Sequence, residues 1–225
     1  MEKRTIKLGT YDTATHGWTL ASCVLSPAEQ KTNFVDKPGG DGSHDLSTAM
    51  TDGIPRYYDR TLTVTLECSD GDRLTRKAKL AHMVNRLDGM RVDIVLPDDA
   101  EHYLTGRLHV APNFNDLAHT SVTVTATCMP WLYDNDVTGV MLDVTAEEQT
   151  VIFEITGRRA VVPNLTVVDP DGTGAQVRLV YGSSSISLSP GRYQWPDLLL
   201  THGEHEVTYS GSGKLLVDYR EAVLE

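Results

Sequence analysis

Two segments of the sequence alternate apolar and polar residues with a period of two. Residues 61–68, TLTVTLEC, carry their apolar side chains at alternate positions, which are Leu62, Val64, Leu66 and Cys68. Residues 121–128, SVTVTATC, repeat the pattern. Because successive side chains of a strand point to opposite faces, each segment is predicted to be a strand with one buried face. Two threonine-rich strands of this kind indicate a β-sandwich rather than a βαβ fold.

Between these strands, residues 72–88 have the periodicity of an amphipathic helix. Their apolar residues recur at i, i+3, i+4 and i+7, as Leu80, Met83, Val84 and Leu87. Ser69 or Asp70 is predicted to cap the start of the helix, and Gly89 suits the position after its end. The cationic residues of the helix are Arg73, Arg76, Lys77, Lys79 and Arg86. We interpret them as a solvated helix face rather than as an interface.

The rest of the chain is predicted to be β-structure. The segments RVDIVLPDD and HYLTGRLHV form a predicted hairpin. After CMPWLYDND, short apolar strands alternate with the turn clusters DPDGTG, SPGRY and SGSGK, which is typical of a second all-β domain. We predict a first domain at residues 1–135, a linker at residues 133–139 and a second domain at residues 138–225. The C-terminal strand is a candidate for returning to the first domain.

The charge of the chain argues against nucleic acids and membranes as partners. The net charge is −11 at pH 7, of which residues 1–135 carry −4 and residues 136–225 carry −7. Such a surface is repelled by phosphates, so specific nucleic-acid binding is not expected. No apolar run approaches the roughly 20 residues of a membrane helix, and neither half has a basic amphipathic face. The opening MEKRTIKLGT lacks the apolar region of a signal peptide.

Candidate chemical sites are few, and each has a simpler interpretation. DPDGTG resembles the start of a calcium loop, but Val180 stands where the bidentate acid belongs, so we favour a tight turn. His202 and His205 of HGEHE are interpreted as solvated histidines in a turn rather than as a metal site. Asp98, Asp99 and Glu101 are interpreted as a polar hairpin turn rather than as a glycosidase pair.

The sequence contains no motif for catalysis. A nucleophile elbow, an HExxH zinc motif and a Gly-rich phosphate loop before a helix are all absent from it. The three cysteines, Cys23, Cys68 and Cys128, have spacings that fit neither a zinc site nor a disulfide framework. We expect them to be reduced and buried. The chain is therefore predicted to be no enzyme and to hold no cofactor or metal.

Five segments in order resemble one protein family. These are PGGDGSHDLSTAM, YYDRTLTVTLEC, a helix ending in LDGM, LPDDAEHYLTGRLHV and VTVTATCMPWLY. The chain is similar in this order to the distal tail proteins of long, non-contractile-tailed bacteriophages, and THGEHEVTYSGSGKLLVDYREAVL is similar to their last strands. The resemblance runs from about residue 17 to residue 224, with residues 140–190 alike only in strand pattern.

The resemblance implies a structural role in a virion. Distal tail proteins form a hexameric ring at the tail tip around the path of DNA ejection, with a β-sandwich or split-barrel ring domain and a galectin-like outer sandwich. The implied partners are the tail-tube, hub and tape-measure proteins and a receptor-binding protein, and the implied site of assembly is the host cytoplasm. Two other functions are weighed against this one, a carbohydrate-binding adhesin and a major tail-tube protein.

Residues 33–57 are interpreted as an arm that contacts a neighbouring subunit. The segment contains KPGGDGSHDLS, and a stretch so rich in glycine and aspartate buries too little apolar area to fold on itself. The expected intersubunit anchors are Phe34, Val35, Leu46, Met50 and Ile54. A one-directional arm supplies the head-to-tail contact that a closed ring requires.

A sugar site in the second domain would need an exposed aromatic ring. The aromatic candidates for glycan contact are Trp195, Tyr193 and Tyr181. Trp195 precedes Pro196 in a turn-rich stretch, but a tryptophan in the core is the favoured interpretation.

Overall fold

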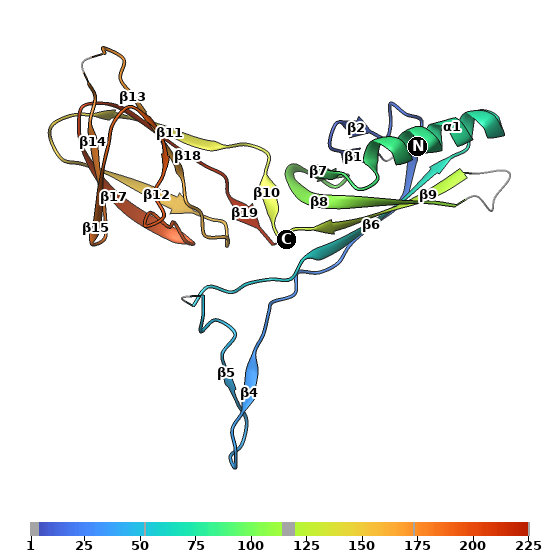
Figure 1. Ribbon diagram of the computed structural model, residues 1–225, viewed down its shortest axis with the longest axis horizontal. Coiled ribbons are helices and arrows are strands. Elements are labelled where there is room, and N and C mark those ends of the chain that lie inside the picture. The colour runs from blue at the N-terminus through green and yellow to red at the C-terminus, as the bar shows by residue number, and fades with distance from the viewer. Residues whose placement is uncertain (1–4, 52, 114–119, 173, 225) are drawn as a thin grey trace. The chain divides into compact units, whose positions relative to one another are not determined.

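The chain is mainly β with a single helix among its described residues, as predicted (Figure 1). The computed structural model describes residues 5–51, 53–113, 120–172 and 174–224. The chain divides into two compact units, Met1–Pro130 and Trp131–Glu225. This division precedes the linker predicted at residues 133–139, because strand β10 (Leu132–Asp134) already pairs with β19 (Ala222–Val223) inside the second unit.

The first unit is built on one antiparallel sheet with the strand order β2-β1-β7-β8-β9-β6-β3. The strands are β1 (Lys7–Leu8), β2 (Tyr11–Asp12), β3 (Thr19–Leu25), β6 (Arg60–Cys68), β7 (Arg91–Leu96), β8 (Asp99–Asn113) and β9 (Thr120–Cys128). The two alternating segments of the sequence are β6 and β9, and they lie side by side with Val64 opposite Val124. This register places both apolar rows on one face of the sheet, and the predicted hairpin forms as β7 and β8.

Helix α1 (Arg73–Leu87) begins at a cap that the sequence analysis assigned wrongly. The N-cap is Asp72, whose carboxylate accepts a hydrogen bond from the Thr75 backbone N–H at 2.8 Å. Ser69 and Asp70 lie before Gly71, whose φ of 81° turns the chain so that only Asp72 adjoins the first helical turn. At the other end, Gly89 follows the C-cap Asp88 with a φ of 75°, as its position in the sequence predicted.

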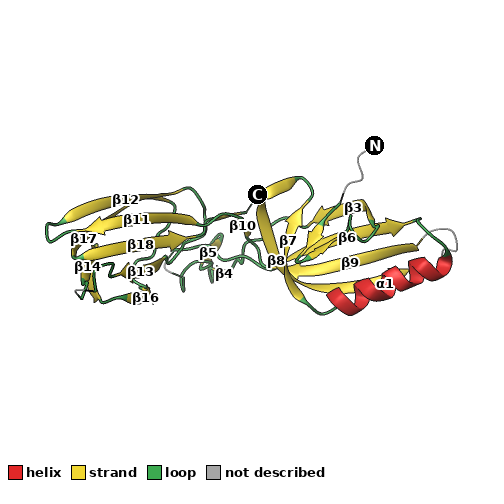
Figure 2. Cartoon of the chain, turned by 90° about the horizontal axis from the view of Figure 1, so that it is seen from above, coloured by secondary structure: helices red, strands yellow, loops and turns green. Residues whose placement is uncertain are grey.

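Helix α1 covers one face of the sheet and leaves the other face open. The helix packs on β8 and β9 (Figure 2). Its buried residues are Arg76, Leu80, Met83 and Leu87. The opposite face of β6 and β9 is a ladder of threonines, in which Thr63 lies opposite Thr125 and Thr65 opposite Thr123. These four side chains are partly exposed. The alternating residues of β6 and β9 therefore form two different faces of the sheet. The apolar residues lie on the face that the helix covers, and the threonines lie on the other face.

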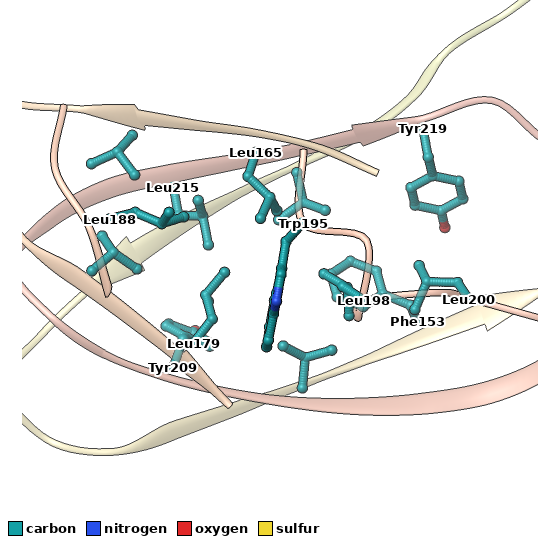
Figure 3. Packing of buried hydrophobic residues seen from close by; sticks show 14 of the residues in the cluster. Phe153, Leu165, Leu179, Leu188, Trp195, Leu198, Leu200, Tyr209, Leu215 and Tyr219 are labelled. Carbon is teal, nitrogen blue, oxygen red and sulfur yellow. The ribbon is translucent and has the colours of Figure 1, made fainter. Parts of the chain in front are cut away.

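The second unit is a sandwich of two four-stranded sheets. One sheet has the order β11 (Thr138–Val144), β18 (Gly213–Tyr219), β13 (Asn164–Val168) and β16 (Gly191–Gln194); the other has the order β12 (Gln149–Ile155), β17 (Gly203–Gly211), β14 (Val177–Tyr181) and β15 (Ser184–Leu188). The SPGRY segment was predicted as a turn, but Gly191–Gln194 is an edge strand paired with β13. Aliphatic and aromatic side chains fill the space between the sheets (Figure 3).

A buried carboxylate holds the end of the chain. Glu221 is 9% exposed and accepts hydrogen bonds from the Thr156 N–H at 2.9 Å, the Thr156 hydroxyl at 2.7 Å and the Gly157 N–H at 2.7 Å. Three donors to one carboxylate satisfy its charge in the interior. This bonding fixes the residue that precedes β19 within the second unit.

The three cysteines are free thiols with different burial. Cys68 and Cys128 are buried, and burial raises the pKa of the Cys128 thiol to about 11. Cys23 is only half-buried, contrary to expectation, because its strand β3 forms the edge of the sheet. Among the described residues, no helix is long and apolar enough to cross a membrane.

Two leucines of α1 provide a test of this packing. Replacing Leu80, which is 2% exposed, by alanine is expected to lower the free energy of unfolding of the first unit by about 2–5 kcal/mol. The matched control, Leu74→Ala on the outer side of the same helix, where Leu74 is 76% exposed, is expected to change it by about 0.5 kcal/mol or less. Urea unfolding of dilute protein, followed by circular dichroism, measures both. Equal losses for the two variants would contradict the assigned helix face.

Candidate interaction surface

The arm, residues 33–57, extends from the pair of strands β3 and β6 (Figure 1). At its base, Gln30 bridges to Tyr57, the Lys31 N–H donates to the Arg56 carbonyl at 2.7 Å, and the Tyr58 N–H donates to the Glu29 carbonyl at 2.9 Å. The Lys31 ammonium lies 5.3 Å from the centre of the Tyr58 ring. The two chain segments that lead into and out of the arm are therefore hydrogen-bonded to each other at its base.

The glycine-rich segment is the turn of a β-hairpin. Strand β4 (Phe34–Asp36) pairs with β5 (Ser43–Asp45), with Val35 opposite His44. In the turn, the Gly40 N–H donates to the Lys37 carbonyl and the Lys37 N–H donates to the Gly42 carbonyl, both at 3.2 Å. Gly39 and Gly42 have φ values of 72° and 74°, which glycine adopts without strain. The glycines thus serve to reverse the chain rather than to bind a phosphate.

A second set of polar contacts holds the hairpin at the end away from its turn. The Leu46 N–H donates to the Asn33 carbonyl and the Asn33 N–H donates to the Ser47 hydroxyl, each at 2.8 Å. The Ser47 N–H donates to the Asp45 carboxylate at 2.9 Å. Hydrogen bonds from the Ser47 hydroxyl and then from its backbone N–H hold the pKa of Asp45 below its usual value. The hairpin is ordered by its own polar groups.

The apolar side chains of the arm are left in solvent. Phe34 is 59% exposed, Val35 47%, Leu46 43% and Met50 98%, and Ile54 is partly buried. None of the described residues between 33 and 57 is buried. Neighbouring residues of a strand point to opposite faces, so Phe34 and Val35 present one apolar group on each side of β4. Exposed large apolar groups gathered on one projecting segment are typical of an interaction surface.

The aromatic residues considered for sugar binding do not form an exposed platform. Trp195 is 6% exposed and lies among the side chains of the sandwich core (Figure 3). Tyr193 and Tyr181 are partly buried and pack against the same core, and the Tyr181 hydroxyl lies 2.7 Å from Nδ1 of His205. Trp195 is therefore the core residue that the sequence favoured, and its ring faces are not available to a sugar.

The other candidate segments are occupied by internal hydrogen bonds. The Gly174 N–H donates to the Asp169 carboxylate at 2.8 Å, as in a tight turn. His205 was predicted to be solvated in a turn, but it is partly buried in strand β17, and its Nε2 lies 2.7 Å from the Thr201 carbonyl. Asp99 accepts from the Glu101 and His102 backbone N–H groups at 3.2 Å. No three His, Cys, Asp or Glu side chains are placed to hold a metal ion among the residues that the structure describes. The absence of a cofactor remains a prediction.

Described residues of the first unit line two notable depressions. One, of about 650 Å³, has a charged lining in which the Arg107 guanidinium donates to the Gly89 carbonyl and His109 contacts Asp88 at 3.1 Å. The other, of about 550 Å³, is bordered by the rings of Tyr11 and His16, which stack with centroids 4.0 Å apart. Arg107, Asp88 and His109 of the first depression and the stacked rings of the second are engaged with the protein itself. We find in them no paired nucleophile and base among the described residues.

Comparisons with known proteins bear on the fold. No protein-family model matches the sequence, and no curated protein matches it. A solved structure, the SPP1 Dit (gp 19.1) protein, described as a paradigm of the hub adsorption apparatus in phages that infect Gram-positive bacteria, matches with a TM-score of 0.66. The match covers 96% of this chain and 98% of that one at 15% sequence identity. This chain therefore has the fold of that Dit protein over nearly its full length.

The core position of Trp195 can be tested directly. Trp195→Ala is expected to lower the free energy of unfolding of the second unit by about 3–5 kcal/mol, because it removes a large side chain from a packed interior. Val168→Ala, at a residue 40% exposed in the same unit, is the control and is expected to cost about 0.5 kcal/mol or less. Thermal unfolding measured by near-ultraviolet circular dichroism reports both. If the Trp195→Ala variant is as stable as the parent, Trp195 does not belong to the core and its assigned position is wrong.

Proposed function

We propose that this protein is a structural component of a phage tail tip and not an enzyme. In this proposal six copies form a ring that joins the tail tube to the tail-tip machinery and surrounds the channel for DNA ejection. The fold shared with a Dit protein over 96% of the chain supports this assignment. The protein belongs to the virion and is assembled in the host cytoplasm.

The observation that carries the proposal is the exposed apolar surface of the arm. Phe34, Val35 and Leu46 are each more than 40% exposed on a hairpin that is held by its own polar contacts. Because the hairpin is already ordered in the free chain, less conformational entropy is lost when it binds a partner. The arm leaves the sheet in one direction, so each copy offers an arm to one neighbour and receives an arm from another. Such heterologous contacts close into a ring.

The open face of the sheet suits a channel for DNA. The threonine ladder of β6 and β9 presents neutral hydroxyls, and residues 1–135 carry a net charge of −4. A neutral or acidic wall does not bind a polyanion, so DNA passes along it without being retained. We assign this threonine-bearing face to the lumen of the ring.

The two units have separate roles in this proposal. The unit Met1–Pro130 forms the ring, and the sandwich of the unit Trp131–Glu225 is the galectin-like outer domain. The ring contacts the tail-tube protein, the tail-associated hub protein and the tape-measure protein, and the outer domain faces the receptor-binding protein.

Removing the apolar groups of the arm is expected to prevent assembly without unfolding the chain. In the variant Phe34→Ser, Val35→Ser, Leu46→Ser, each contact loses three anchors that contribute about 1.5–3 kcal/mol apiece when buried. A loss of that size weakens association by about a thousandfold or more. Size exclusion with light scattering is expected to give six times the 24.8 kDa chain mass for the parent and the single-chain mass for the variant. Melting curves of the two proteins are expected to coincide below the association threshold.

A matched control separates the arm from general surface apolarity. Val137→Ser, Met141→Ser, Val168→Ser removes three aliphatic groups that are 51%, 52% and 40% exposed in the second unit. This control is expected to assemble like the parent. An intact hexamer from the arm variant would show that the arm is an ordinary loop, and a parent protein that stays monomeric would contradict the ring.

A further inference from the structure

The outer side of helix α1 is a cationic surface with an apolar centre. The helix has five cationic residues and no acidic residue in its 15 positions. The cationic helix face is defined by its exposed residues Arg73, Leu74, Lys77, Ala78 and Ala81. Leu74 is 76% exposed and stands between the two charged side chains along the helix.

The charges of the cationic helix face are unfavourable within the isolated chain. The positive end of the helix dipole lies at the N-terminus, where Arg73 is the first helical residue. The first turn contains no acid, and the carboxylate of the N-cap Asp72 accepts a hydrogen bond from the Thr75 backbone N–H. Arg73 and Lys77 are spaced i, i+4 and repel each other. Within the described part of the chain, neither has an ion-pair partner. The sequence predicted a solvated face, but solvation does not explain why a leucine is exposed between two like charges.

A surface of opposite sign lies on the outer side of strands β12 and β17. The acidic sheet face is defined by Ile152, Glu154, Glu204 and Glu206. Glu154 lies directly opposite Glu204, and Ile152 directly opposite Glu206. All four are exposed, and Ile152 is 62% exposed.

This acidic face is also unfavourable in a single chain. Like charges directly opposite each other destabilise a strand pair, and none of the three glutamates has an ion-pair partner among the described residues. The chain therefore carries two exposed faces of opposite sign. Each face combines one large aliphatic side chain with charges that find no compensation in their own unit.

We propose that the cationic helix face of one copy docks on the acidic sheet face of another copy. Leu74 then packs near Ile152, and Arg73 and Lys77 pair with the surrounding glutamates. The two faces differ, so the contact is head-to-tail, and each copy gives one face and receives the other. This inference rests on the proposed function because it describes a contact between copies in the same assembly, additional to the arm.

Charge reversal with rescue tests the contact. The helix variant is Arg73→Glu, Lys77→Glu, and the sheet variant is Glu204→Lys, Glu206→Lys. Each is expected to raise the dissociation constant for self-association by about tenfold or more, because cognate charges become like charges. An equimolar mixture of the two variants places opposite charges against each other in alternate copies. The mixture, and the chain that carries all four substitutions, are expected to associate within about threefold of the parent.

The control reverses the same number of charges elsewhere in the second unit. Glu147→Lys, Glu148→Lys changes two exposed acids in the turn between β11 and β12 and is expected to leave association unchanged. Sedimentation velocity at low and at high salt measures all five proteins and the mixture. Circular dichroism verifies that each variant is folded, which is expected because every substituted side chain is exposed.

The outcomes separate this contact from the ring. Restoration in the mixture supports the contact even if the associated species is not a hexamer, in which case the proposed function fails alone. A hexamer whose association is insensitive to either double variant leaves the ring standing and overturns the contact. Double variants that weaken association but do not rescue each other overturn it as well, because the lost interaction then lies elsewhere.

Discussion

The absence of a buried side chain in the arm is the constraint on which the rest of this account depends. Ordering a residue costs about 1–2 kcal/mol of backbone entropy, and a segment normally recovers that cost by burying apolar area. The described part of residues 33–57 buries no side chain and relies on the β4–β5 pairing, three left-handed glycines and the Asp45–Ser47–Asn33 contacts. The conformation of the hairpin is therefore fixed by its own hydrogen bonds, whereas its apolar side chains stay exposed to solvent. A neighbouring molecule would satisfy them, and this requirement motivates the proposed ring.

The same reasoning extends to charge. In the core of the second unit, three hydrogen-bond donors compensate the buried carboxylate of Glu221. On the surface, the cationic helix face and the acidic sheet face lack such compensation. The exposed apolar side chains of the arm and the unpaired charges on these faces are different features, and each motivates one of the two proposed contacts between copies. In the proposed assembly, the function of the protein depends on these surfaces.

The sequence predicted those parts of the fold that bury one face. Strands β6 and β9 and helix α1 were found because Leu66, Val124 and Leu80 belong to periodic apolar rows. Strands β4, β5 and β16 were not found, because they are short and mostly exposed, so no periodic apolar row marks them and backbone pairing alone defines them. The arm residues were named from composition and resemblance, whereas the acidic sheet face was missed. Glu154 and Glu204 are far apart in the sequence, and only the register of β12 against β17 places them opposite each other.

The central claim is that copies of this chain close into a ring through head-to-tail contacts. Negative-stain electron microscopy of the purified parent protein tests it most directly, because end-on views show both the number of copies and whether the contacts close. The account predicts closed rings of six copies with an open centre. Single particles of one chain, compact two-fold dimers or open filaments would contradict it.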